Sequence, residues 1–220
     1  MAYLLCIETA TTNCSVALVN EEGLLAYKED YDNNYSHAER LHVFIRDMLA
    51  EAKIDFADLS AIAVSKGPGS YTGLRIGVSA AKGLCYALDI PLLSVPTLKG
   101  LAKQITAGNG VIIPMIDARR MEVYSAIYDA STYEEIKETK AEILEPESYQ
   151  RYLEKGKVYF IGNGVAKFKE ICDHPNAEFI LGKLPSAKEM AILGYDKFLN
   201  KDFEDVSYFD PYYLKDFVTN

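Results

Sequence analysis

The spacing of hydrophobic positions changes along the chain and predicts an ordered series of strands and helices. Short apolar runs separated by turn-forming residues are typical of strands joined as hairpins, and they occur at 3–7, 14–19 and 24–28. The apolar residues then recur every three or four positions, which predicts a helix over 36–53. Ser36 begins this helix with Glu39 three positions later, the spacing of a capping box.

The next part of the chain alternates strands with helices. Apolar runs at 61–65 and 91–95 predict strands, and each is followed by a predicted helix, at 72–88 and 97–106. Strands that alternate with helices pair in parallel, whereas the first three strands can form a meander. The predicted order of this half is therefore β-β-β-α-β-α-β-α.

The same order begins again after Gly108-Asn109-Gly110. Three predicted strands come first, at 111–116, 122–128 and 136–144. Predicted helices at 146–155, 164–173 and 186–199 follow, with apolar runs at 158–161 and 178–181 between them. No repeat of residues accompanies this repeat of order, so we predict two α/β lobes of duplicated βββαβαβα architecture. We place the N-terminal lobe at 1–107 and the C-terminal lobe at 108–202; the aromatic tail 203–220 either joins the N-terminal lobe or forms a solvated end.

The composition and charge of the chain disfavour several classes of function. The 220 residues carry 23 Lys and Arg against 32 Asp and Glu, a net charge of −9, which disfavours unaided binding of RNA or DNA. No apolar run approaches the ~20 residues that span a membrane, and the first residues do not read as a signal peptide. None of the four cysteines stands at the spacing of a zinc knuckle or a redox pair, so we expect a reduced, cytoplasmic protein without a membrane anchor.

The most distinctive local segment is Gly67-Pro68-Gly69-Ser70-Tyr71-Thr72-Gly73-Leu74-Arg75-Ile76-Gly77. It lies between a predicted strand and a predicted helix, where glycines and a helix N-terminus favour anions. Its glycine spacing matches neither a P-loop nor a dinucleotide fingerprint. Phosphate binding and a tight structural turn therefore both stay open.

The helices at 36–53 and 72–88 have wide apolar faces, and glycines inside a helix cost roughly 1 kcal/mol each against alanine. Either both faces of each helix are core, or each helix offers one face to a partner, with Gly73 and Gly77 allowing close approach. On the second view Gly77→Arg abolishes partner binding and leaves the fold intact. The interface candidates are Leu41, Ile45, Met48, Gly73, Leu74, Gly77, Val78, Ala81 and Cys85.

Candidate polar residues lie near the ends of the first strand of each half, Glu8 and Asp117, where two carboxylates can hold a hydrated metal or anchor turns. Weaker candidates for cofactor contact are Thr11, Arg119, Gly162 and Gly164. Arg119 and Arg120 either neutralise Asp117 or receive a phosphate. The spacing of His37 and His42 is wrong for a metal pair, and no Ser-His-Asp set is visible, so we expect no metal site and no catalytic residue.

Five segments together resemble the TsaB (YeaZ) family: LLCIETATTNCSVALV, SHAERL, GPGSYTGLRIG, PLLSVPTLKGLA and IDARRMEVYSAIYD. The resemblance covers most of 3–128 and is loose over 130–207. It implies an actin-like ATPase (ASKHA) fold of two duplicated lobes. It also implies a role in forming threonylcarbamoyladenosine beside the anticodon of tRNAs that read ANN codons.

The resemblance further implies a scaffold without catalysis of its own, which pairs with the catalytic paralogue TsaD and recruits TsaE. The alternative is an independent enzyme that uses Glu8 and Asp117. Where TsaD carries an H-x-x-x-H iron site, residues 97–101 hold no histidine, and Ala10 and Arg119 stand where the fold's nucleotide turns carry glycine. We therefore expect no intrinsic cofactor, ATP or ADP only at the junction with TsaD, tRNA contact through the complex, and a possible homodimer of the lone chain.

Overall fold

The computed structural model describes residues 1–31 and 37–215, and the chain divides into two units. Unit 1 combines Met1–Gly100 with the segment from Pro185 onward, and unit 2 is Leu101–Leu184. Each unit contains one five-stranded mixed sheet. Among the described residues, no helix is both long enough and apolar enough to cross a membrane.

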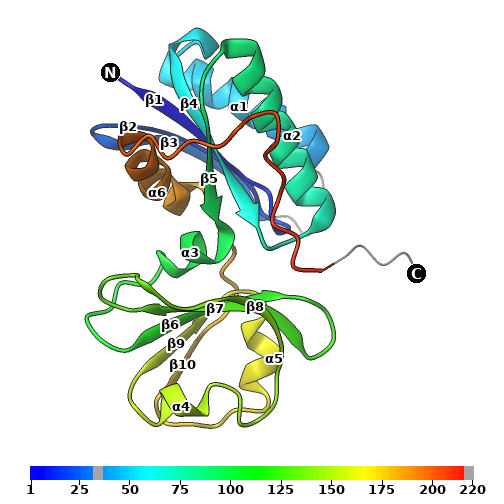
Figure 1. Ribbon diagram of the computed structural model, residues 1–220, viewed down its shortest axis with the longest axis vertical. Helices are drawn as coiled ribbons and strands as arrows, with labels where there is room; N and C mark the ends of the chain where they lie inside the picture. The colour runs from blue at the N-terminus through cyan, green and yellow to red at the C-terminus, as the bar shows by residue number, and fades with distance from the viewer. Residues whose placement is uncertain (32–36, 216–220) are drawn as a thin grey trace. The chain divides into compact units, whose positions relative to one another are not determined.

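The sheet of unit 1 has the strand order β3-β2-β1-β4-β5 (Figure 1). Its strands are β1 (Tyr3–Glu8), β2 (Cys14–Asn20), β3 (Gly23–Asp30), β4 (Leu59–Gly67) and β5 (Leu92–Pro96). The first three strands form an antiparallel meander, and β1, β4 and β5 pair in parallel. The parallel strands therefore end at one edge, where the glycine-rich turn follows β4.

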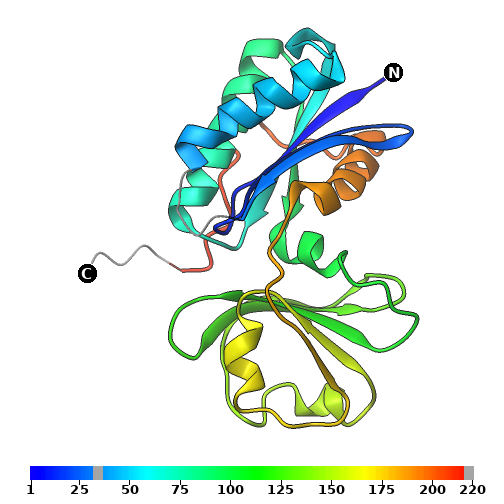
Figure 2. The same ribbon diagram turned by 180° about the vertical axis from the view of Figure 1, so that it is seen from behind.

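Helices cover both faces of this sheet (Figures 1 and 2). Unit 1 contains α1 (His37–Ala52), the short 3-10 turn η1 (Phe56–Asp58), α2 (Tyr71–Leu88) and α6 (Ala187–Leu199), and α3 (Thr97–Ala102) follows β5. Side chains of β1 alternate between the two cores: Leu5 and Ile7 pack in the α1 and α2 core, while Leu4 and Cys6 pack in the α6 core. This explains why β1 is apolar at nearly every position rather than at every second one.

Unit 2 repeats the topology of unit 1. Its sheet has the order β10-β9-β6-β7-β8, in which β8, β7 and β6 are antiparallel and β6, β9 and β10 are parallel. Its strands are β6 (Val111–Asp117), β7 (Glu122–Asp129), β8 (Glu135–Ile143), β9 (Val158–Ile161) and β10 (Ala177–Ile180). The short helices are α4 (Gln150–Leu153) and α5 (Val165–Lys169). The predicted duplication is confirmed, and the fold is the actin-like ATPase fold.

The unit boundaries differ from the predicted lobes. Helix α6, which we placed in the C-terminal lobe, belongs to unit 1 because Ala187, Met190 and Ala191 pack against its sheet. The helices predicted at 146–155 and 164–173 are a single turn or slightly longer. The tail lies with unit 1, where Phe209 packs against the α1 and α2 core. The predicted cap Ser36 lies outside the described residues.

The residues expected to form a partner interface require a correction, because all nine are buried inside unit 1. Six of them, together with their neighbours on the sheet, make up one hydrophobic cluster. The two glycines also face inward: a Cβ at Gly73 would lie 2.1 Å from the carbonyl oxygen of Thr9, and one at Gly77 would lie 2.2 Å from Thr9 Oγ1. The glycines therefore admit the chain's own β1–β2 turn rather than a partner helix.

Candidate functional site

Glu8 ends β1 and is completely buried. Its Oε1 accepts hydrogen bonds from Ala10 N and Ser65 Oγ, each at 2.7 Å. Burial raises the pKa of this carboxyl to about 7, and the hydrogen bonds from Ala10 and Ser65 oppose that rise. No group in the described residues hydrogen-bonds Oε2. A carboxyl that is partly protonated near neutral pH is a poor ligand for a hydrated divalent cation.

The glycine-rich turn packs on the β1–β2 turn that follows Glu8. Ser70 N donates to Ala10 O at 2.6 Å, and Thr9 Oγ1 donates to Gly73 O at 2.8 Å. A Cβ at Gly69 would lie 2.3 Å from Ala10 O. The backbone approach that the sequence suggested for a phosphate is therefore taken by the chain itself. Thr11 is buried in the same turn, where its carbonyl accepts from His37 Nε2 at 2.6 Å.

Asp117 ends β6 and is balanced by a lysine that the sequence did not reveal. Lys167 Nζ on α5 lies 2.5 Å from Asp117 Oδ1 and also donates to Arg120 O and Glu122 O. Asp117 N donates to Asn163 Oδ1 at 2.9 Å. This ammonium group, rather than a guanidinium, neutralises the carboxylate. Lys167 stands fifty positions along the chain, and no local motif marks it.

Arg119 follows Asp117 in the β6–β7 turn and touches it only through its backbone, because Arg119 N donates to Asp117 Oδ1 at 2.9 Å. Arg119 and Arg120 both have positive φ, 68° and 49°. Both residues are exposed. The two arginines are thus placed beside the carboxylate without being paired to it.

Gly162 and Gly164 flank Asn163, whose Oδ1 accepts a hydrogen bond from Asp117 N, and so lie beside Asp117, a proximity that the sequence did not predict. Their free space is already filled, since a Cβ at Gly162 would lie 2.2 Å from Met115 O and one at Gly164 would lie 2.8 Å from Val123 Cγ1. Gly164 N donates to Met115 O at 3.0 Å. The lack of a side chain at these glycines allows the backbone to pack closely against β6. Glu8 and Thr11 lie in unit 1, whereas Asp117, Arg119, Gly162 and Gly164 lie in unit 2.

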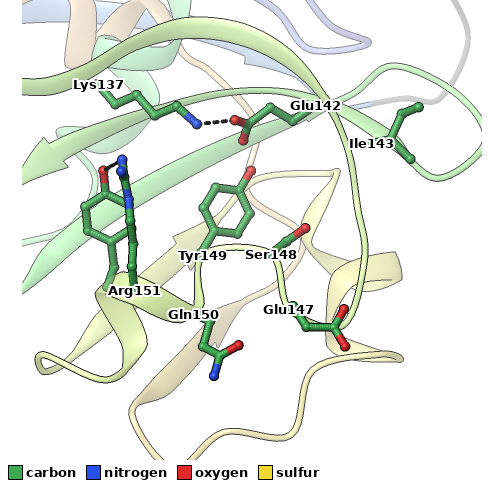
Figure 3. A pocket seen from close by; sticks show the side chains of 9 residues that line it. Lys137, Glu142, Ile143, Glu147, Ser148, Tyr149, Gln150 and Arg151 are labelled. Atoms are coloured by element: carbon green, nitrogen blue, oxygen red, sulfur yellow. Dashed lines mark hydrogen bonds and ion pairs between the residues drawn. The ribbon is translucent and has the colours of Figure 1, made fainter.

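Unit 2 also contains a pocket of about 420 Å³ between β8 and α4 (Figure 3). Tyr149, the residue before α4, points toward the sheet, where its hydroxyl hydrogen-bonds Ser125 Oγ of β7 at 2.9 Å. Ser125 Oγ also donates to Glu142 Oε2 at 3.1 Å, and Glu142 pairs with Lys137. Burial raises the pKa of the Tyr149 hydroxyl. These polar side chains hydrogen-bond or ion-pair with one another, and no motif in the sequence predicts the pocket.

The tail covers one flank of α2, and the last described segment runs beside that helix (Figure 1, red). Lys82 Nζ donates to Ser207 O at 3.3 Å and to Phe209 O at 2.9 Å, and Arg75 Nε donates to Tyr213 OH at 3.3 Å. The two basic residues of α2 that lie outside its core face are therefore engaged by the chain's own tail.

The remaining outward flank of α2 is uncharged. Its residues are exposed or half-buried and fall within a sector of ~100° at the usual helical rotation. They are Thr72, Ile76, Ser79, Ala80, Gly83 and Ala87, which we call the open face of α2. A Cβ at Gly83 would meet no atom within 4 Å. Exposed residues on the neighbouring helix α1 include Val43 and Ala50.

Comparisons with known proteins agree on one relationship. The family model for TsaD, tRNA N6-adenosine threonylcarbamoyltransferase, matches residues 33–218. The tRNA threonylcarbamoyladenosine biosynthesis protein TsaB of Escherichia coli (strain K12) is 31% identical over 98% of this chain and 95% of its own. YeaZ from Pseudomonas aeruginosa superposes with a TM-score of 0.84 at 30% identity, covering 97% of this chain and 100% of that chain. The ethanolamine utilization protein EutJ from Carboxydothermus hydrogenoformans matches at TM-score 0.50 and 11% identity over 88% of this chain and 89% of that one, which supports the fold alone.

Proposed function

Because this chain belongs to the TsaB (YeaZ) family of tRNA threonylcarbamoyladenosine biosynthesis proteins, we propose that it is the non-catalytic subunit that docks and activates the paralogue TsaD. The observation that carries the proposal is the open face of α2. Uncharged residues fill an exposed sector of a helix in a chain of which 25% is charged. Depletion of charge is the compositional mark of the centre of a protein interface.

The partner follows from the family relationship. A TsaD family model describes most of this chain, so TsaD is expected to present helices equivalent to α1 and α2. Two related surfaces of this kind can meet about a pseudo-twofold axis, with helices packing against helices. Small residues such as Ser79, Ala80 and Gly83 permit a close approach. The same surface would pair with its own copy when TsaD is absent.

The absence of a catalytic role is supported by the state of the two carboxyl groups. Burial holds the pKa of Glu8 at about 7, and Asp117 is ion-paired with Lys167. The glycines that might have admitted a phosphate are packed against Ala10 and Met115. In this proposal TsaD carries the chemistry, ATP or ADP binds only at the junction of the two subunits, TsaE is recruited to the pair, and the complex holds the tRNA.

The experiment tests the open face with Gly83→Arg. A long charged side chain at the centre of this face should lower TsaD affinity at least ~100-fold, since an unpaired charge in an interface costs several kcal/mol. Binding is measured by size-exclusion chromatography with light scattering and by calorimetry. The substitution is expected to leave the fold intact, because a Cβ at Gly83 has open space.

The matched control is Gly156→Arg in unit 2, another glycine whose Cβ would meet no atom within 4 Å. It adds the same side chain and should leave TsaD binding unchanged. The variant Gly77→Arg is not a suitable test, since Gly77 faces Thr9 and the change would disrupt unit 1 itself. Full TsaD affinity in Gly83→Arg would refute docking through this face.

A further inference from the structure

The β6–β7 turn of unit 2 presents two adjacent arginines, and we propose that this turn, which we call the arginine turn (residues 117–122), binds the phosphodiester backbone of RNA. The inference rests on the proposed function for the choice of RNA, because that function places the chain in a complex that acts on tRNA. The site itself is argued from the charges and conformation of unit 2.

The first step concerns charge. The natural partner of these arginines is Asp117, but Lys167 Nζ already holds that carboxylate at 2.5 Å and is anchored by the carbonyl oxygens of Arg120 and Glu122. Across residues 1–31 and 37–215, neither Arg119 nor Arg120 takes part in an ion pair. In a chain of net charge −9, two neighbouring guanidinium groups without an acidic partner form a local cationic point.

The second step concerns conformation. Arg119 and Arg120 adopt φ of 68° and 49°, a region that suits glycine or asparagine and that long side chains seldom occupy. The turn is nevertheless fixed: Ala118 N donates to Glu122 O at 3.0 Å, and Glu122 N donates to Arg119 O at 3.1 Å. The fold thus holds two arginines where turn geometry alone would favour smaller residues. Strained backbone conformations cluster at functional sites, which is consistent with a binding role for this turn.

The third step concerns the ligand. A guanidinium group donates two parallel hydrogen bonds to phosphate oxygens, and this contact is insensitive to base sequence. A free nucleotide needs an enclosed site with backbone N–H groups, and here Gly162 and Gly164 are packed against β6. An exposed turn instead suits successive phosphates along a strand. The net acidity of the chain makes this a supporting contact within an assembly rather than a complete RNA site.

The experiment uses the full chain, a fluorescently labelled tRNA transcript and anisotropy titrations from about 50 mM salt upward. Arg119→Gln with Arg120→Gln should weaken binding about 10-fold or more and reduce the slope of log K against log salt by about one to two. The control is Lys155→Gln with Lys183→Gln, which removes two exposed charges from the same unit and should change affinity less than about 2-fold.

A second variant separates binding from folding. Arg119→Gly with Arg120→Gly removes the charges and relieves the positive φ, so its melting temperature should hold or rise while RNA affinity falls as in the glutamine variant. No RNA binding by the wild-type chain at low salt, or equal binding by wild type and both arginine variants, overturns the proposal. Calorimetry with ADP tests the alternative ligand. If ADP binds the wild-type chain and not the glutamine variant, the turn binds a nucleotide and the RNA assignment is overturned.

Failure here is distinguishable from failure of the proposed function. The arginine variants should retain full TsaD affinity, and Gly83→Arg should retain the RNA affinity of the isolated chain. Loss of TsaD binding in the arginine variants would mean that the turn belongs to the subunit interface, which also overturns the RNA assignment.

Discussion

The carboxyl group of Glu8 is completely buried and inaccessible to solvent. Its folded-state pKa of about 7 lies above the ordinary value of 4.5, so the native protein binds this proton more tightly than the unfolded chain. The stabilisation is present below about pH 4.5 and is lost as the pH rises through 7. Glu8→Gln keeps the acceptor for Ala10 N and Ser65 Oγ and removes the ionisation.

We therefore expect Glu8→Gln to exceed the wild type in stability by less than about 1 kcal/mol near pH 5 and by up to roughly 3 kcal/mol near pH 8.5. Urea unfolding at the two pH values measures the difference. Glu22→Gln, which alters an exposed carboxylate, should show no such dependence on pH. An advantage of Glu8→Gln that is the same at both pH values would show that ionisation of this group is not its cause.

Glu8 and Asp117 could be predicted from the sequence because a polar residue that ends an apolar strand stands out. It could not find their partners. Ser65 and Lys167 come from elements 57 and 50 residues away, and only the folded sheet brings them to the carboxylates. The protonation of Glu8 and the neutralisation of Asp117 depend on these partners and on burial, so neither was predictable from local pattern.

Two glycines of helix α2, Gly73 and Gly83, are expected to respond in opposite ways to alanine substitution, as measured by the stability of the chain. Alanine favours a helix over glycine by about 1 kcal/mol. At Gly83 nothing opposes this gain, so Gly83→Ala should stabilise the chain by roughly 0.5–1 kcal/mol. At Gly73 the added Cβ would meet a backbone oxygen of Thr9 at 2.1 Å, and Gly73→Ala should destabilise it by about 2 kcal/mol. Chemical denaturation of both variants tests the pair, and a stabilised Gly73→Ala would contradict the packing described for the β1–β2 turn.

Helices α1 and α2 and the glycines of α2 could be predicted from the sequence, but the residues expected at a partner interface are buried inside unit 1. An apolar helical stripe such as Leu74, Val78 and Cys85 predicts contact, and it does not say whether the contact is with the chain or with a partner. Only the position of Thr9 under Gly73 and Gly77 settles that question. The open face of α2 is not predictable from the sequence because small uncharged residues give a weak hydrophobic signal.

The repeated order of strands and helices was predictable because each lobe shows the same alternation of strand-like and helix-like hydrophobic spacing. The boundary was not, since α6 follows unit 2 in sequence and packs on the sheet of unit 1. The hydrophobic pattern of a helix does not indicate which sheet the helix packs against. The same holds for the tail, whose aromatic residues were compatible with packing and with a solvated end.

Substitutions in the tail test how far the stability of unit 1 depends on this segment. Glu204 N donates to Leu92 O at 2.8 Å, Tyr212 N donates to Lys66 O at 2.7 Å, and Phe209 packs on the α1 and α2 core between these anchors. Phe209→Ala should therefore cost about 2 kcal/mol and accelerate amide exchange at Tyr212. Its neighbour Tyr208 is 85% exposed, so Tyr208→Ala should stay within about 0.5 kcal/mol of wild type. Equal stability of the two variants would mean that the tail is not an integral part of unit 1, whereas the expected difference would make the tail a structural support for one flank of α2.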